Sequence, residues 1–94
     1  MNAKDKGTRN ERRARALLES SGYSVVRAGR SLGVFDLVAF GRKGVVFVRV
    51  RTNRGLGVTE RARLERVDNL PAGASKQIWL FRDLCTDPSI EVIP

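Results

Sequence analysis

The sequence predicts an α/β domain in which a central mixed β-sheet is flanked by two helices. Three observations predict it: a helical repeat near the N-terminus, three successive strand-like segments, and a second helical segment followed by two further strands. The order helix, three strands, helix, two strands indicates helices packed on one sheet. The strands on either side of the second helix should run parallel, through a right-handed crossover. A length of 94 residues fits one domain, residues 1–94, with residues 1–7 expected to be flexible.

The first helix is expected to begin at residue 8 or 9, to continue to about residue 20, and to end at Gly22 as a C-cap. At about 100° per residue, Ala14 and Leu18 share one face. Arg9, Arg12 and Arg13 point away from this face. Glu11 lies on it, so a carboxylate points at the body of the protein. This placement is unusual for a glutamate and marks Glu11 as a candidate functional residue.

The other elements follow from β-branched runs, glycine-rich turns and a second helical pattern. Trp79 and Phe81 alternate with apolar neighbours in one of the strands, so we expect them in the core or at a dimer contact. The second helix is expected to begin at Thr59 and Glu60 and to stop at Pro71. The expected ranges are strand 23–27, loop 28–34, strand 35–40, turn 41–44, strand 45–51, helix 59–70, strand 77–82 and strand 90–93.

The composition is that of a soluble, strongly basic protein. A hydrophobic content of 41% argues against a disordered chain, and no apolar run is long enough for a membrane span or a secretory signal. The single Cys85 is typical of a reducing compartment, and we expect a cytoplasmic protein with this cysteine as a partly buried apolar residue. The net charge is +8, and 14 of the 18 basic residues are arginines. Arginine suits phosphate, which favours a nucleic-acid partner over the alternative of a merely solubilising surface.

Four charged residues on the predicted elements form the candidate site. Glu11 lies on the first helix, Asp36 on the second strand, and Arg49 and Arg51 point to one side of the third strand. Asp36 and Arg49 are thirteen positions apart, with a tight turn between them. An acidic residue facing charged groups on the next strand is an arrangement that many metal-dependent nucleases use.

With these residues, the chain resembles the archaeal-type Holliday junction resolvases of the PD-(D/E)xK nuclease superfamily. The family has a glutamate in the first helix, a serine- and glycine-bearing loop, an aspartate on the second strand, and a carboxylate-x-lysine motif on the third. Glu11 in KGTRNERRARALLESSGY, Ser31 in AGRSLGV, Asp36 in FDLVAF and Arg49-Val50-Arg51 occupy these positions. The resemblance covers residues 6–52, while residues 58–94 match in element order. It implies a resolvase-like fold, a role in DNA recombination or repair, and a homodimer.

The third motif departs from the family, because Arg49 replaces the second carboxylate and Arg51 replaces the lysine. In the family, the two carboxylates hold a divalent metal that activates water. Here Asp36 remains as the main candidate ligand, with Glu11 acting through water. Arginine cannot lose its proton to relieve repulsion from a metal ion. The departure therefore predicts that metal-dependent chemistry is impaired or lost, with no cofactor, or with Mg²⁺ if the chain is an active enzyme.

Two interpretations of the charge cluster remain open. In the first, Asp36–Arg49 and Glu11–Arg51 are ion pairs that hold the first helix on the sheet. In the second, the arginines form a patch that binds phosphate, and both interpretations can hold together.

The preferred hypothesis is binding of branched or duplex DNA through phosphate contacts with little reading of bases. One alternative is an active Mg²⁺-dependent DNA endonuclease that uses Glu11, Asp36 and a main-chain carbonyl. Another is a small basic RNA-binding protein. The sequence leaves the DNA structure, the pathway and protein partners open. The candidate DNA-binding residues are Arg9, Arg12, Arg13, Arg30, Ser31, Arg49, Arg51 and Arg54.

Overall fold

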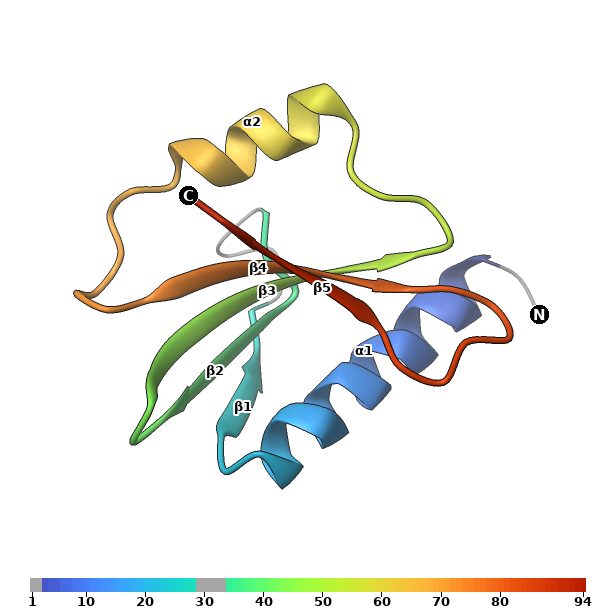
Figure 1. Cartoon of the computed structure of the whole chain (residues 1–94), viewed down its shortest axis with the longest axis horizontal. Helices are drawn as coiled ribbons and strands as arrows, with labels where there is room; N and C mark the ends of the chain where they lie inside the picture. Colours follow the sequence, from blue (N-terminus) through green and yellow to red (C-terminus); the bar gives the residue numbers. More distant parts are fainter. Residues whose placement is uncertain (1–2, 29–33) are drawn as a thin grey trace.

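The structure, a computed structural model, describes residues 3–28 and 34–94, with the backbone alone for residues 3–5. It contains two helices and five strands in the predicted order (Figure 1). No helix in these described ranges combines the length and the apolar character that crossing a membrane requires. The elements are α1 (Ala3–Ser20), β1 (Ser24–Arg27), β2 (Leu37–Gly41), β3 (Gly44–Thr52), α2 (Val58–Arg66), β4 (Ser75–Phe81) and β5 (Ser89–Ile93).

The five strands form one mixed sheet whose spatial order is the same as their order in the sequence. β3 and β4, which precede and follow α2 in the sequence, are neighbours in the sheet and run parallel. The other three pairs of strands are antiparallel. The tight turn between β2 and β3 pairs Gly41 with Gly44, and Gly44 has a φ of 119°, which glycine accepts without strain. The predicted mixed α/β sheet is confirmed.

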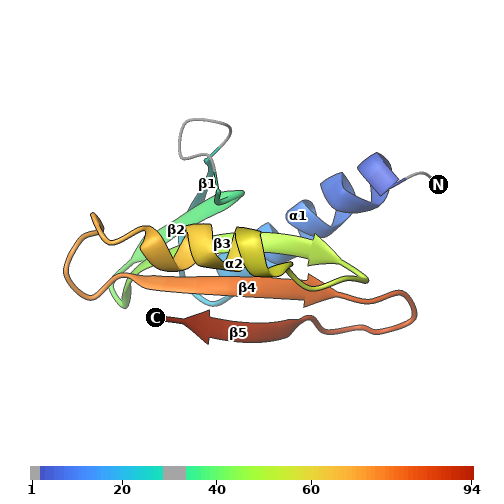
Figure 2. The same cartoon turned by 90° about the horizontal axis from the view of Figure 1, so that it is seen from above.

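The two helices cover opposite faces of the sheet (Figures 1 and 2). Alternate β3 residues point to opposite faces, so Val48 packs on the α1 side while Phe47 packs on the α2 side. The α1 side is a well-buried core, in which Trp79 and Phe81 are 5% and 1% exposed, as predicted. The α2 side contains fewer fully buried residues and several that are only partly covered, because α2 is short.

The first helix begins earlier than predicted. It starts at Ala3, so residues 3–7, which were expected to precede the helix, belong to it. Its C-terminus is as predicted, because Gly22 has a φ of 99° and donates its N–H to the carbonyl of Glu19 at 3.1 Å. Tyr23 donates to the carbonyl of Leu18 at 3.1 Å, which completes a Schellman motif.

The second helix ends earlier than predicted, at Arg66, and its N-cap is Gly57. The buried ammonium of Lys76 donates hydrogen bonds to the carbonyls of Leu64, Glu65 and Val67, at 2.9, 3.0 and 2.9 Å. Leu64 and Glu65 lie in the last turn of α2 and Val67 is its C-cap, the region where a helix leaves carbonyls without intrahelical partners. Lys76, in β4, thus caps α2 and fixes it to the sheet.

Cys85 corrects a further expectation. It is exposed in the segment between β4 and β5, where a partly buried position was expected. The turn that contains it projects from the sheet next to the N-terminal half of α1 (Figure 1).

Candidate nucleic-acid interface

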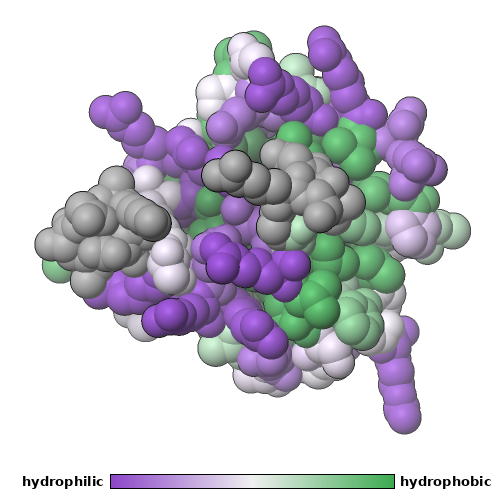
Figure 3. Space-filling view, turned by 180° about the vertical axis from the view of Figure 1, so that it is seen from behind, coloured by the Kyte–Doolittle hydropathy of each residue, from purple (hydrophilic) through white to green (hydrophobic). Residues whose placement is uncertain are grey.

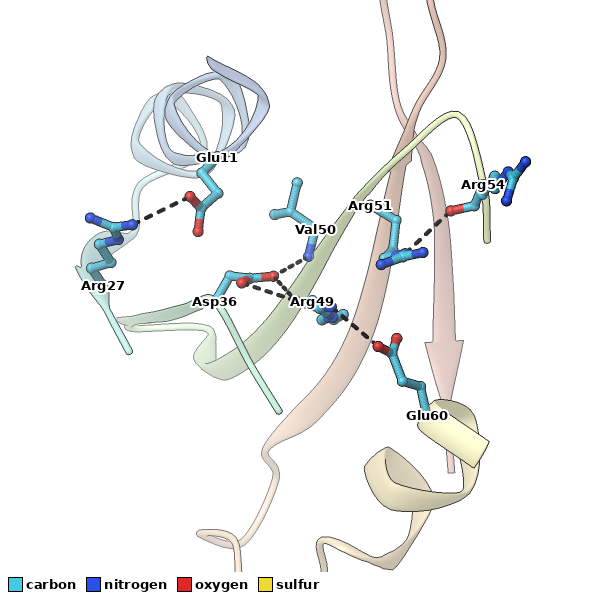
Figure 4. A network of polar contacts seen from close by, with 8 residues as sticks. All are labelled: Glu11, Arg27, Asp36, Arg49, Val50, Arg51, Arg54 and Glu60. Carbon is cyan, nitrogen blue, oxygen red and sulfur yellow. Dashed lines mark hydrogen bonds and ion pairs between the residues drawn. The ribbon is translucent and has the colours of Figure 1, made fainter. Parts of the chain in front are cut away.

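An open cleft of about 550 Å³ lies where the N-terminal half of α1 meets the ends of β1 and β3. It gathers Glu11 from α1, Asp36 from the segment before β2, Arg49 and Arg51 from β3, and Arg54 from the loop after β3 (Figure 4). Four arginines and two carboxylates line it, so its excess charge is positive. The lining residues are Gly7, Thr8, Glu11, Arg27, Asp36, Arg49, Val50, Arg51, Thr52 and Arg54.

Asp36 is positioned by the register of the β2–β3 hairpin. Leu37 pairs with Val48, and the Asp36 N–H donates to the carbonyl of Val48 at 2.8 Å. Antiparallel pairing therefore places Asp36 opposite Arg49, on the same side of the sheet. Both oxygens of Asp36 accept hydrogen bonds from Arg49 Nη1 at 3.1 Å, and Oδ2 also accepts the N–H of Val50 at 2.7 Å. The predicted Asp36–Arg49 pair is confirmed.

Arg49 contacts a second carboxylate that the sequence did not identify. Its Nη2 lies 3.6 Å from Oε1 of Glu60, in the first turn of α2. The guanidinium is thus held between Asp36 and Glu60, as Figure 4 shows. The other oxygen of Glu60 is buried and has no hydrogen-bond partner in the described part of the chain. We call Asp36, Arg49 and Glu60 the paired centre of the cleft, in which two carboxylates oppose one guanidinium.

Glu11 does not pair with the arginine that the sequence predicted. The predicted Glu11–Arg51 pair is wrong, because Glu11 Oε2 lies 3.7 Å from Arg27 Nη2 instead. Glu11 approaches the cleft from α1, whereas Arg51 and Arg49 occupy alternate positions on the other side of β3. Burial raises the pKa of Glu11 above its usual value, and the charge of Asp36 adds to this shift. The charges of Arg27 and Arg49 oppose the shift in pKa.

Arg51 and Arg54 lie at the open margin of the cleft. Arg51 donates its Nε–H to the main-chain carbonyl of Arg54 at 3.3 Å, and Arg54 is exposed. Neither arginine forms an ion pair with a carboxylate among the side chains described, which are those of residues 6–28 and 34–94. Their charges are therefore available to a ligand, unlike that of Arg49.

The arginines of α1 divide into two groups. Arg9 and Arg12 are exposed, as the helical pattern indicated. Arg13, expected to point outward with them, instead stacks over Phe81, with its Cζ 4.8 Å from the ring centroid. It also donates to Asn10 and to the carbonyl of Thr86. Two further candidates from the sequence, Arg30 and Ser31, lie outside the described residues.

The arginine rim consists of the exposed or half-exposed arginines on either side of the cleft that are not paired to a carboxylate. In the described ranges, Arg51 and Arg54 line the cleft, and Arg12 lines an adjoining hollow with Thr8, Glu11 and Arg27. Arg9 is exposed on the same helix as Arg12, and we count these four arginines as the rim.

The donors in this cleft do not fit a divalent metal. No cluster of three or more histidine, cysteine, aspartate or glutamate residues suited to a metal ion occurs in the described ranges. Both oxygens of Asp36 already accept hydrogen bonds, and a guanidinium lies against them. Mg²⁺ demands several oxygen ligands in octahedral geometry, which these contacts do not offer.

No protein-family model matches the sequence, and no curated protein matches it either. Among solved structures, the chain is similar to Hjc, a Holliday junction resolvase from Archaeoglobus fulgidus. The TM-score is 0.69, and the match covers 95% of this chain and 72% of that one, at 22% sequence identity. The chain has a resolvase-like fold. At this identity the similarity establishes the architecture, which confirms the fold that the sequence predicted.

Proposed function

We propose that this chain binds branched or duplex DNA through its phosphates, and that metal-dependent nuclease chemistry at its cleft is impaired or lost. One observation carries the proposal: the Arg49 guanidinium is held between the carboxylates of Asp36 and Glu60. The position that the resemblance assigns to a metal ligand is therefore a cation. The resolvase-like fold and the net charge of +8 support DNA as the partner.

The electrostatic cost of a metal in the paired centre supports loss of the chemistry. A divalent ion about 5 Å from a guanidinium meets a repulsion of roughly 6 to 7 kcal/mol at an effective dielectric near 20. Binding through Asp36 would also require it to release Arg49 or the N–H of Val50. Arg51 cannot replace the lysine as a proton acceptor, because a guanidinium keeps its proton.

The arginine rim is the proposed phosphate-binding surface. Arg13 and Arg49 leave the set that the sequence suggested, because intramolecular contacts engage both side chains. About four phosphate contacts would give a slope of log K against log salt of roughly −4. A slope near zero, measured by fluorescence anisotropy over a salt series, would contradict phosphate-driven binding.

A homodimer is part of the proposal, because the resemblance implies one and an apolar surface supports it. On the α2 side of the sheet, Val26 and Phe40 are 48% and 44% exposed, and Val38 and Val45 beside them are only partly buried. Figure 3 shows hydrophobic side chains gathered next to hydrophilic ones on the face seen from behind. Analytical ultracentrifugation should detect a dimer that Phe40→Ser weakens. A monomeric wild type at micromolar concentration would remove the dimer from the proposal.

The second candidate is an active Mg²⁺-dependent endonuclease. It is favoured by the fold and by the convergence of Glu11 and Asp36 on one cleft. In that case Arg49 would have to leave Asp36 before a metal could bind.

One experiment separates these candidates. A labelled four-way junction, its matching duplex and an RNA control are incubated with the protein in Mg²⁺, Mn²⁺ or EDTA, and scored for binding and cleavage. We expect binding of DNA that persists in EDTA and no cleavage in either metal. Mg²⁺-dependent nicking that disappears in Asp36→Ala would establish the endonuclease instead, and a preference for RNA would overturn the DNA assignment.

Calorimetry tests the role of residue 49 without DNA. We expect no binding of Mn²⁺ at millimolar concentration by the wild type. Arg49→Glu with Arg51→Lys places a third carboxylate beside Asp36 and Glu60, and this variant should bind the ion. Arg54→Glu adds a carboxylate at the margin of the cleft, and this control variant should not bind the ion. Equal binding by the wild type and the double variant would show that Arg49 does not block a metal site.

A further inference from the structure

Leu84 occupies an unusual position at the tip of the turn after β4. Its side chain is fully exposed, at 107% of the reference accessibility, and its φ is 66°. Cys85 donates its N–H to the carbonyl of Arg82 at 3.2 Å, so Leu84 is the third residue of a four-residue turn. A positive φ at that position is typical of a type II turn, in which glycine or asparagine is preferred. Leucine therefore strains the turn without burying its own side chain.

The turn is fixed on both sides of Leu84. Asp83 accepts hydrogen bonds from Lys6 at 2.8 Å and from Asn53 at 3.1 Å, and its N–H donates to Asn53 Oδ1 at 2.9 Å. On the other side, Arg13 donates to the carbonyl of Thr86. The exposed leucine is thus presented by an anchored turn, which reduces the conformational entropy that a contact at Leu84 would lose.

The anchors connect this turn to the basic surface. Lys6 belongs to α1, and Asn53 directly precedes Arg54 of the arginine rim. The hydrogen bond from Lys6 is the main cause of the lowered pKa of Asp83. Lys6 lies about one helical turn before Arg9 on α1. In Figure 1 the turn between β4 and β5 lies beside the N-terminal half of α1. The turn that carries Leu84 is therefore anchored to two segments that also carry rim arginines, Arg9 on α1 and Arg54 after β3.

We propose that Leu84 is a wedge that inserts between bases of DNA bound at the arginine rim. The inference rests on the proposed DNA binding and adds the contact that distinguishes distorted or branched DNA. Proteins that bend DNA insert aliphatic side chains between base steps and unstack them, while basic residues hold the phosphates. The unstacking cost is smallest where bases are already unpaired, so a branch point or mismatch should bind better than continuous duplex.

A single exposed apolar residue is also common on protein surfaces. Val58, 88% exposed at the start of α2, provides a matched control. It has similar exposure and apolar character, but it lies outside the turn and the arginine rim.

The test uses two DNA probes in EDTA. A four-way junction carries 2-aminopurine next to the branch point, and a duplex carries it in the middle of the site. Wild type should raise the fluorescence of the junction probe, which reports unstacking. Leu84→Asn and Leu84→Gly suit a positive φ, so both should melt at or above the wild-type temperature. Both should abolish the fluorescence rise and weaken junction binding about tenfold, the lower range of what contacts to unstacked bases contribute. Val58→Asn should leave both readouts unchanged.

The two proposals fail in different ways. If wild type binds DNA at low salt but the Leu84 variants match it in affinity and fluorescence, the wedge is wrong and DNA binding stands. If Val58→Asn lowers both readouts as much as the Leu84 variants, the effect is not specific to the turn and the wedge is wrong. If wild type binds no DNA at low salt, both proposals are overturned.

Discussion

Arg49 and Arg51 are two residues apart on one strand, yet they lie in two chemically different parts of the cleft. Arg49 belongs to the paired centre, where Asp36 and Glu60 balance its charge. Arg51 belongs to the arginine rim and contacts a main-chain carbonyl, not a carboxylate. The difference arises because the hairpin register, continued past Leu37 and Val48, places Asp36 opposite Arg49 but places no carboxylate opposite Arg51.

The comparison shows that a basic composition does not identify the residues that meet a ligand. The net charge of +8 counts Arg49 and Arg51 equally. In the folded chain, two carboxylates at the junction between the hairpin and α2 balance the charge of Arg49, whereas Arg51 contacts only a main-chain carbonyl. Substitutions in the paired centre should therefore change stability, and substitutions in the arginine rim should change DNA binding.

The largest effect is expected from reversing charge in the arginine rim. Arg51→Glu with Arg54→Glu should weaken DNA binding about 100-fold at low salt, because two charge-assisted phosphate contacts are lost. The salt slope should become shallower by about 2. Fluorescence anisotropy against salt measures both quantities. Arg42→Glu with Lys43→Glu makes the same charge change at the exposed β2–β3 turn, at the other end of β3 from the cleft, and an equal loss there would show that net charge alone sets affinity.

The next effect tests the attachment of α2, which carries Glu60 to the paired centre. Lys76→Met should lower the free energy of unfolding by about 2 to 3 kcal/mol, because three carbonyls lose a charged donor. Urea denaturation measures this loss of unfolding free energy. Lys43→Met, at the exposed hairpin turn, is the control and should change stability little. Equal stability of the two variants would show that the Lys76 cap contributes little.

A smaller loss of stability is expected within the paired centre itself. Arg49→Gln leaves two carboxylates without their shared cation and should cost about 2 kcal/mol of unfolding free energy. Its DNA affinity, measured below the melting temperature, should stay within about twofold, since the substitution leaves the rim contacts in place. Arg51→Gln should weaken DNA binding and leave the free energy of unfolding nearly unchanged. If Arg49→Gln binds DNA worse than Arg51→Gln, the division into centre and rim is wrong.

The smallest effect concerns the pH dependence of Glu11. Because burial raises its pKa in the folded state, the ionised side chain lowers stability relative to the protonated one. Any stability advantage of Glu11→Gln over wild type should be largest above the raised pKa and should shrink as pH falls through it. Thermal melts across the acidic range measure this difference. An advantage that grows at low pH would contradict the raised pKa.

The sequence supported those contacts that follow from local geometry. The pairing of Asp36 with Arg49 follows from a hairpin whose two-residue turn fixes the register. The inward placement of Glu11 and the C-cap at Gly22 follow from helical spacing. Each depends on a short stretch of chain, in which spacing alone determines the neighbours.

The contacts that were missed join elements distant in sequence. Glu60 was interpreted as part of a helix start, although an acidic residue so early in α2 could also reach the sheet. Glu11 pairs with Arg27 because the end of β1 lies next to α1, and the spacing of these residues in the sequence does not predict that contact. The early end of α2 depends on Lys76, ten positions further along the chain. The helix start at Ala3 was missed because residues 3–7 contain no apolar repeat.

The agreement between strand order and sequence order also has a kinetic consequence. Every strand pairs with the strand before it in the chain, so the sheet can be built outward from the β2–β3 hairpin without a long search. That hairpin brings Asp36 and Arg49 together at once, while Glu60 arrives only after the slower parallel pairing of β3 with β4 brings α2 into place. A chain in which only the hairpin has formed would therefore contain a centre with one carboxylate, and the guanidinium would gain its second partner when α2 packs on the sheet.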